Sequence, residues 1–340
     1  MRTRNPLPIA YRRIGGMTLI ELMVALGIGS FLMIGALTVF MQSRTTFRVN
    51  EAVARLQENG RYVFDVMEPD VRMAHFWGLR TRSFAITGRA SPDDPVSGLS
   101  PGGDCGTNWT VNLDESVESS NNSYGFTCGA FGTAVATADT LVVRRAAEDV
   151  EAVLAANTMY IQSSRSDNSA LFVGAALPAG FLPATSRTHR LVINGYYVSQ
   201  NSSLDTPGNP IPSLRRKFLR NGNAGDPSIR DEEILPGVED MQIQFGVDTD
   251  LEGTAGRGVV DRYVNPQDPI LDDTNAAFNP DAEILAVRIW LRLRSERIEN
   301  GIPADLGYVY ADQVVAPIND GLRRIVVTKT IYLRNARPAS

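Results

Sequence analysis

The 340-residue chain has few of the residues that enzymes commonly place at their active sites. Its two histidines, His75 and His189, lie far apart in the sequence and in no metal-ligand spacing. There is no H-E-x-x-H pair, no glycine-rich phosphate loop and no C-x-x-C motif. One G-x-S-x-G match, at residues 98–102, lies among turn-forming residues and not between a strand and a helix. The sequence therefore offers no candidate for catalysis, and we do not expect an enzyme.

Cysteine is equally scarce, with Cys105 and Cys128 the only two in the chain. An even pair in an oxidising compartment is typical of a disulfide, which here would close a loop of about 23 residues. In the chain-entropy picture such a loop contributes on the order of 3 kcal/mol to stability. A metal site needs more ligands than these two, and no histidine lies near them in the sequence. We expect Cys105 and Cys128 to form a disulfide.

The chain does contain one long apolar run, from Met17 to Met41, in which Glu21 is the only ionisable residue. As a helix, a run of about 25 residues reaches roughly 37 Å, enough to cross a hydrocarbon layer of about 30 Å with some tilt. The preceding residues, 1–16, carry four arginines and no acid. By the positive-inside bias this flank stays in the cytoplasm, and everything after Met41 lies across the membrane.

Two features distinguish the apolar run from a signal peptide and from a simple anchor. A signal peptide has a shorter apolar core followed by small residues at its cleavage site, whereas here Gly15 and Gly16 precede the run. Insertion of an acid within a membrane helix costs about 2.5–3.5 kcal/mol of free energy, so the presence of Glu21 calls for a functional explanation. Cleavage after Gly16 would create a cationic α-amino group on Met17, about one helical turn from Glu21. The alternative is an ordinary single-span anchor with a chance glutamate.

Gly16, Met17 and Glu21, with the basic flank and the apolar run, resemble the start of type IV pilins and pseudopilins. In that family a short basic leader ends in glycine, an apolar residue follows, and a glutamate comes four residues later. The apolar residue is usually phenylalanine, so Met17 is a departure. The resemblance implies that a prepilin peptidase removes residues 1–16 and methylates the new amino group of Met17. It also implies that Glu21 pairs with such an amino group as subunits assemble.

Acidic residues outnumber basic ones in this chain. The net charge is −5, and loss of the four arginines in residues 1–16 leaves 29 basic against 38 acidic residues, a net charge of −9. A protein this acidic is a poor binder of phosphate backbones, so we predict no nucleic-acid partner. The basic triplet Arg215-Arg216-Lys217 is interpreted as part of a strand with a solvated face.

After Met41 the helical pattern continues. Apolar residues recur at spacings of four and three from Val49 to Ala74, which predicts an amphipathic second half of the same helix within residues 42–78. Pro69 should kink or loosen its last turn. The amino-acid sequences of this segment and of one later block resemble those of the PilW-type minor pilins. The matching stretches are Arg48-Val49-Asn50-Glu51, residues 55–61, Val71-Arg72-Met73-Ala74, Trp77-Gly78, residues 235–242 and residues 245–250.

Residues 79–340 are expected to form a β-rich globular domain. Residues 91–128 are rich in proline, glycine, serine, asparagine and aspartate, which predicts a long surface segment of loops pinned by the disulfide. Other runs alternate apolar and polar side chains, as expected for an antiparallel sheet with one face on the amphipathic helix. The clearest strands are predicted at residues 140–144, 159–162, 190–199, 214–220, 238–247, 283–294 and 324–334. The expected fold class is therefore α+β and pilin-like, with a long N-terminal helix packed on an antiparallel β-sheet domain.

One acidic turn is a candidate metal site. In residues 248–253 acids alternate with other residues before a glycine, and Asp261 follows. Such spacing presents oxygen ligands to a hard cation such as Ca²⁺. A glycine-rich insertion that contains Arg257 interrupts the loop, and the alternative is a metal-free hairpin turn. Apart from Ca²⁺ at this turn, no cofactor is expected. The candidate ligands are Asp248, Asp250, Glu252 and Asp261.

The resemblance to PilW-type minor pilins implies a structural and assembly role. It implies a single-pass subunit of the inner membrane with a periplasmic C-terminal domain, which joins other minor pilins and the major pilin. This complex primes pilus assembly and sits in the pilus, with a large tip adhesin as a further partner. Two alternatives stay open. One is the minor pseudopilin of type II secretion, and the other is a surface-binding module or adhesin that uses residues 91–128 for recognition.

Overall fold

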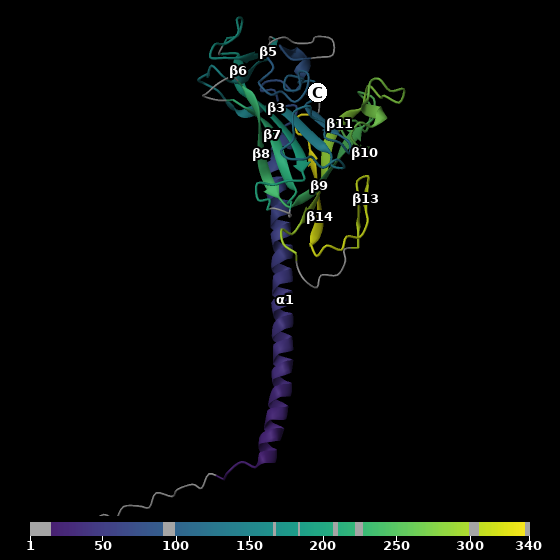
Figure 1. The fold of residues 1–340 in the computed structure, drawn as a ribbon. Helices are drawn as coiled ribbons and strands as arrows, with labels where there is room; N and C mark the ends of the chain where they lie inside the picture. The colour runs from purple at the N-terminus through teal and green to yellow at the C-terminus, as the bar shows by residue number, and fades with distance from the viewer. Residues whose placement is uncertain are drawn as a thin grey trace, which may run out of the picture. The chain divides into compact units, whose positions relative to one another are not determined.

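The computed structural model describes residues 15–90, 99–165, 168–182, 184–206, 210–221, 227–298 and 306–336. A long α-helix, α1 (Leu19–Arg72), precedes all the strands (Figure 1). By internal contacts the chain divides into two compact units, Met1–Val53 and Ala54–Ser340, so α1 contributes to both. Most of the predicted leader, residues 1–14, lies outside the described residues.

The first unit contains the apolar half of α1. This part of the helix is long and apolar enough to span a membrane, and its side chains are exposed in the isolated chain. The hydroxyl groups inside it are turned back onto the helix. Ser30 donates to the carbonyl of Gly27 at 3.0 Å, and Thr38 donates to that of Ile34 at 2.6 Å. Such bonds satisfy the hydroxyls without water, as a membrane segment requires.

In the second unit α1 is amphipathic, as its spacing predicts. Its buried stripe has the expected spacing, with Leu56, Gly60, Val63, Met67 and Val71 all buried. Charged and polar side chains occupy the exposed positions between them. The helix continues through Pro69 and ends at Arg72, so it stops within one turn of the proline that was expected to weaken it.

The strands of the second unit form two main sheets. The larger sheet runs in the order β1-β5-β4-β6-β3-β2, with β7 paired to β6 and β8 paired to β7. Its pairings are antiparallel except for β1 with β5. The strands are β1 (Ile86–Thr87), β2 (Val117–Ser120), β3 (Thr140–Val150), β4 (Met159–Ser164), β5 (Ser169–Val173), β6 (Ser186–Ser199), β7 (Ser213–Arg220) and β8 (Ser228–Pro236).

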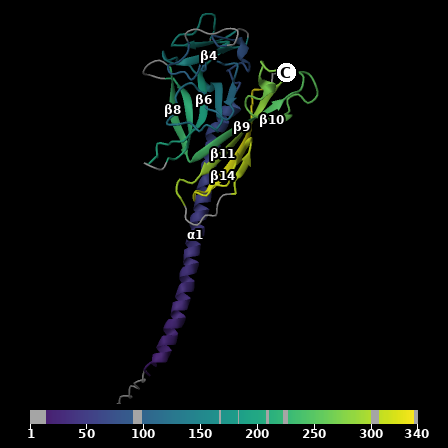
Figure 2. The same cartoon turned by 45° about the vertical axis from the view of Figure 1, so that its right-hand side comes forward.

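The smaller sheet is antiparallel and runs in the order β10-β9-β11-β14, with β9, β11 and β14 side by side in Figure 2. A separate two-stranded hairpin, β12–β13, follows β11 in the chain. These strands are β9 (Val238–Asp248), β10 (Arg262–Val264), β11 (Glu283–Arg294), β12 (Tyr308–Tyr310), β13 (Gln313–Val315) and β14 (Arg324–Tyr332). The predicted α+β fold class, with a long N-terminal helix on antiparallel strands, is confirmed.

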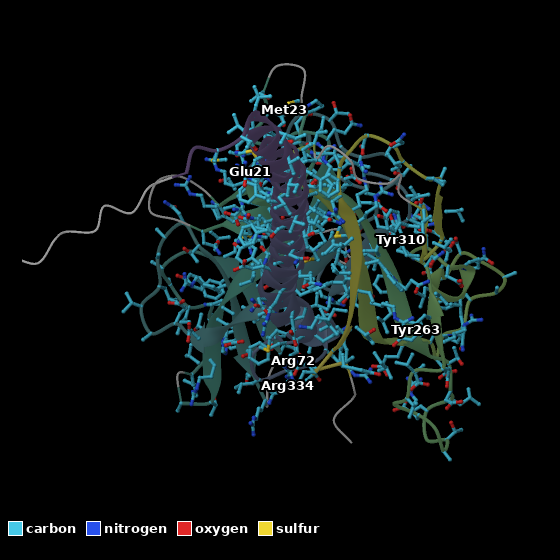
Figure 3. The ribbon with its side chains drawn as sticks, turned by 90° about the horizontal axis from the view of Figure 1, so that it is seen from below. Glu21, Met23, Arg72, Tyr263, Tyr310 and Arg334 are labelled. Carbon is cyan, nitrogen blue, oxygen red and sulfur yellow. A yellow bond between two sulfur atoms is a disulfide. The ribbon has the colours of Figure 1, made fainter. Side chains whose placement is uncertain are left out.

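The second half of α1 packs closely on β14. A methyl group at Gly60 would lie 3.2 Å from a methyl carbon of Val327, so this crossing has room only for glycine without adjustment. The ammonium group of Lys329 pairs with Glu68. Beyond the helix end, the backbone N–H of Arg334 donates to the carbonyl of Arg72 at 3.0 Å, and Figure 3 shows these two residues next to one another.

Two hydrophobic cores lie on opposite faces of the larger sheet. Successive strand residues alternate between them, so Leu141 and Val143 face α1 while Val142 faces the other core. The second core is covered by the segment that begins at residue 99. Its buried side chains include Trp109, which is 6% exposed, and Leu113, which is 0% exposed.

Residues 99–128 contain the short strand β2 and otherwise loops closed by the disulfide, but they do not lie wholly at the surface as expected, since Trp109, Leu113 and Phe126 are buried. The free face of the larger sheet is apolar, and this segment buries it although it forms only one short strand, β2. The turn-forming residues allow an irregular path, and the scattered large side chains fill the core. Residues 91–98 lie outside the described residues.

All seven expected strands are present, with ends that differ by a few residues. The interpretation of Arg215-Arg216-Lys217 as part of a strand is confirmed, but the expectation that the strand has a solvated face here is wrong. Arg215 and Lys217 are 5% and 7% exposed. Along the adjacent β8, Asp231 lies 2.7 Å from Arg215 and 2.8 Å from Lys217, and Glu232 pairs with Arg216. The acids of β8 thus neutralise a basic triplet that the sequence alone presents as free.

Candidate functional site

The predicted cleavage site lies directly before α1. Gly15, Gly16 and Met17 are exposed and non-helical, and no neighbouring atom lies within 4 Å of where a side chain would begin at either glycine. Met17 itself is 65% exposed. A protease needs an accessible chain without regular structure, and the bond between Gly16 and Met17 meets this requirement.

Glu21 has a local partner that the sequence reasoning missed. Its backbone N–H donates to the hydroxyl of Thr18 at 3.3 Å, and its carboxylate accepts from the hydroxyl and the backbone N–H of Thr18 at 3.4 and 3.5 Å. These reciprocal contacts have the pattern of a capping box, with Thr18 at the N-cap and Glu21 three residues later. The T-x-x-E signature in the sequence was the signal for it. A carboxylate is also stabilised at this end of α1 by the helix dipole.

The capping geometry fits the role that the resemblance implies for Glu21. The carboxylate accepts long hydrogen bonds and keeps lone pairs free, so it can also accept from an ammonium group. Cleavage after Gly16 would place such a group on Met17, the residue before Thr18. Glu21 can therefore cap its own helix first and then pair with a cleaved N-terminus.

Cys105 and Cys128 are joined by a disulfide. Cys105 is 1% exposed, and its carbonyl accepts a hydrogen bond from the N–H of Thr127 at 2.9 Å. The chain just after Cys128 is fixed to the larger sheet. Lys217 donates to the carbonyl of Gly129 at 2.6 Å, and the guanidinium of Arg215 lies 3.9 Å from the ring centroid of Phe131. The disulfide thus closes a segment that is packed on the domain.

The structure brings together three of the four candidate Ca²⁺ ligands. Carboxylate oxygens of Asp248, Asp250 and Asp261 all lie within 4.8 Å of one another, and Glu252 is not part of this group. Oxygen donors at such separations can share one hard cation.

The same carboxylates also have partners within the turn. Buried Asp248 accepts from the backbone N–H groups of Asp250 and Gly258, and Arg257 approaches it to 3.7 Å. Asp261 accepts from the N–H and the hydroxyl of Thr249 at 2.7 and 2.8 Å, which lowers its pKa below the ordinary value. The donor chemistry suits Ca²⁺, while Arg257 supplies a competing positive charge. Ca²⁺ binding stays a prediction.

One buried acid outside these sites has a strongly shifted pKa. Asp139 accepts backbone hydrogen bonds from Asn122 and Ile243, both at 2.7 Å, and so joins the turn after β2 to β9. The pKa of Asp139 is raised to about 7, chiefly by burial and to a lesser extent by the carboxylates of Asp312 and Asp240, against the lowering effect of the two hydrogen bonds. Both carboxylate oxygens serve to connect the two sheets, so the arrangement is structural.

Comparisons with known proteins agree with these features. The family model of the type IV pilus-assembly protein W matches residues 195–335, and that of the prokaryotic N-terminal methylation motif matches residues 11–37. A search of the curated proteins finds no match. Among solved structures, a type IV-like pilin from Thermus thermophilus is similar at 12% identity, over 84% of this chain and 98% of that one, with a TM-score of 0.37.

The two family matches fall on different parts of the chain. The methylation motif covers the predicted cleavage site, Glu21 and most of the apolar run, which supports anchoring of α1 in a membrane. Like the type IV pilins that it resembles, the chain combines this motif with a long α1 on antiparallel strands. Within that class, the match at residues 195–335 confirms the predicted resemblance to PilW-type minor pilins, and it includes the smaller sheet on which α1 packs.

Proposed function

We propose that this protein is a PilW-type minor pilin that takes part in priming type IV pilus assembly, with a structural role and no catalytic one. The observation that carries the proposal is the presence in one chain of an N-terminal methylation motif and a match to the pilus-assembly protein W. A prepilin peptidase would cut after Gly16 and methylate Met17, and the exposure of this bond supports such processing.

The proposed location is the inner membrane, followed by the pilus. Residues 1–16 carry four arginines and would stay in the cytoplasm by the positive-inside bias. The second unit would then lie in the periplasm. Its disulfide supports this orientation, because disulfides persist in oxidising compartments such as the periplasm.

The proposed partners are other minor pilins and the major pilin, with a large tip adhesin as a further partner. The apolar half of α1 would contact neighbouring helices first in the membrane and then in the filament. Gly27, Gly29 and Gly35 lie on this half, and a β-carbon at any of them would have nothing within 4 Å beyond the adjacent turns of the helix. Small residues allow helices to approach closely in lipid, so these glycines support helix packing between subunits.

The two alternative functions have less support. A minor pseudopilin of type II secretion would share the N-terminal motif, but the match at residues 195–335 is to a pilus-assembly family. The adhesin alternative needs residues 91–128 as a recognition loop. Within residues 99–128 the side chains of Trp109, Leu113 and Phe126 are buried in the second core, which leaves fewer of them to contact a surface.

Processing and pilus number together test the proposal. In a strain that lacks the chromosomal copy, we expect wild-type protein to restore pili and to yield an N-terminal peptide that begins with methylated Met17. Gly16→Val should abolish this peptide and the pili, while Gly15→Ala, at an equally exposed glycine, should preserve both. Normal pili with defective type II secretion in the deletion strain would instead support the pseudopilin.

A further inference from the structure

The helix just beyond the apolar run has an unusual distribution of charge. Residues 42–50 contain Arg44 and Arg48 and no acid, and the next acid is Glu51. Arg44 and Arg48 are four residues apart on α1, so they share one face of the helix. Both are exposed, and neither makes an ion pair within the part of the chain that the structure describes. Phe47, which is 69% exposed, lies beside them.

This basic segment lies at the end of the membrane span where basic residues are least expected. The positive-inside bias concentrates arginine and lysine on the cytoplasmic side, where residues 1–16 already carry four arginines. Two more arginines close to the opposite end of the span run against that bias. A specific attraction at that surface of the membrane would offset it.

The rise of the helix places these arginines at the depth of the lipid headgroups. The hydrocarbon core of a bilayer is about 30 Å thick and the whole bilayer about 40–45 Å, which leaves roughly 5–8 Å of headgroups on each side. At about 1.5 Å per residue, Arg44 is roughly 4.5 Å and Arg48 roughly 10 Å beyond Met41. Long arginine side chains reach back toward such a layer while their aliphatic stems cover apolar surface.

The other side chains of this segment suit the same layer. Thr45 donates its hydroxyl to the carbonyl of Met41 and Thr46 donates to that of Gln42, both at 3.0 Å. Thr38, inside the apolar run, bonds to Ile34 in the same way. The segment therefore presents threonine methyl groups, an aromatic ring and two guanidinium groups to its surroundings. Aromatic residues are enriched where the hydrocarbon meets the headgroups.

We propose that Arg44 and Arg48 bind the phosphate groups of anionic lipids in the leaflet away from the N-terminus, with Phe47 at the boundary of the acyl chains. A guanidinium group forms paired hydrogen bonds with a phosphate, and it is less strongly hydrated than an ammonium group. The inference rests on the membrane insertion of α1, which is part of the proposed function, and not on the role in pilus assembly. The bound lipid would hold the subunit at a defined depth before it enters a filament.

Retention of lipid by the full-length protein tests this assignment. The protein is reconstituted into phosphatidylcholine vesicles that contain phosphatidylglycerol, extracted in mild detergent and examined by native mass spectrometry. We expect the wild type to retain phosphatidylglycerol over phosphatidylcholine. The double variant Arg44→Gln/Arg48→Gln should lose this preference by about tenfold or more, since each arginine near an anionic surface contributes on the order of a fivefold effect.

Two control variants make the result specific. Arg61→Gln removes an equally exposed arginine from the same helix, well beyond the headgroup layer, and should retain lipid like the wild type. Arg44→Lys/Arg48→Lys keeps the charge and should retain most of the preference. Circular dichroism of each variant verifies that the helix is intact.

Equal retention by the double glutamine variant and the wild type would overturn the proposal, and so would an equal loss in Arg61→Gln. A crosslink from residue 44 or 48 to acids of another subunit, with no lipid preference, would assign the arginines to a protein contact instead. Pilus number is measured separately. If the double glutamine variant loses lipid retention but still supports normal pili, the lipid site is supported independently of pilus assembly. A wild-type protein that does not insert into vesicles would contradict the membrane anchoring itself.

Discussion

The carboxylate of Asp70, near the end of α1, lies 2.6 Å from the guanidinium of Arg145 on β3. Their side chains are 7% and 14% exposed. The same carboxylate accepts from the hydroxyl of Tyr196 at 2.6 Å and from the amide of Asn194, both on β6. One acid on the helix thus connects it to two strands of the larger sheet. Together with the packing of Gly60 on Val327, this contact fixes the second half of α1 between the two sheets.

Removal of the Asp70 carboxylate should destabilise the second unit strongly. Asp70→Ala leaves Arg145 and two polar side chains buried without their acceptor, and breaking such a pair typically costs about 3–5 kcal/mol. The free energy of unfolding in denaturant measures the loss. Glu68→Ala, at the more exposed pair with Lys329, is the matched control and should cost about 1 kcal/mol or less. Equal losses in the two variants would contradict the role of Asp70.

Asp139 should make the stability depend on pH. Its folded pKa of about 7 lies above the ordinary value of 3.8, so the folded state favours the protonated acid. The stability that Asp139 contributes is therefore complete below about pH 4 and is lost as the pH rises to about 7. Thermal melts across this window measure the effect.

The variant Asp139→Asn is uncharged at every pH and lacks one hydrogen-bond acceptor. We expect the wild type to be more stable than this variant by the largest margin at low pH. The difference in stability should shrink as the pH rises. A difference that stays constant from pH 4 to pH 8 would show that Asp139 titrates with an ordinary pKa in the folded state.

Glu21 allows its charge and its capping role to be separated. Glutamine can act as the third residue of a capping box but carries no charge. If pairing with the cleaved N-terminus is essential, Glu21→Gln and Glu21→Ala should both abolish pili, and we expect this result. Thr18→Ala, which removes only the cap at a cost of about 1 kcal/mol, should preserve most of them. Pilus counts and protein levels in membranes distinguish these outcomes, and wild-type piliation by Glu21→Gln would refute the electrostatic role.

Loss of the disulfide should weaken the second core. A closed loop of about 23 residues contributes on the order of 3 kcal/mol, and Cys105 is also buried in that core. We expect the double variant Cys105→Ser/Cys128→Ser to melt at a lower temperature than the oxidised wild type. A reductant should lower the melting temperature of the wild type and leave that of the double variant unchanged. An oxidised wild type that melts no higher than the double variant would contradict this account.

The calcium hypothesis can be tested at the acidic turn. It predicts heat of binding when Ca²⁺ is titrated into the purified protein, and a rise in melting temperature. Asp248→Asn should reduce both, because Asp248 is the buried member of the three carboxylates. Ser203→Ala, a change to another exposed loop, serves as the control. No heat and no change in melting temperature for the wild type would leave a turn stabilised by Arg257 and its own hydrogen bonds, without a cation.

Prediction of the fold from the sequence succeeds best where apolar residues recur with a regular period, because the period indicates which side chains are buried. The stripe from Leu56 to Val71 identified the packed face of α1, and alternation through Val287 and Ile289 identified β11. Strand β8 was missed because the run Asp231-Glu232-Glu233 looks solvated. Its pairing with the basic triplet on β7 is visible only once the two strands are adjacent.

Other contacts depend on the three-dimensional path of the chain, which local sequence patterns do not indicate. Trp109 and Leu113 have no regular spacing, so the sequence did not reveal that their segment covers a second core. The partners Asp70 and Arg145 are far apart in the chain, and many other arginines were equally plausible partners. The capping box at Thr18 and Glu21, in contrast, is local, and its T-x-x-E spacing is visible in the sequence.

The two cysteines of the disulfide differ in their exposure. Cys105 is 1% exposed and packs in the second core with Trp109, whereas Cys128 is only partly buried. A reducing thiolate would therefore attack Sγ of Cys128, so that a mixed disulfide forms there and Cys105 leaves as the thiolate. Reduction of the folded protein would thus begin at Cys128, at the end of the segment that Lys217 ties to the larger sheet.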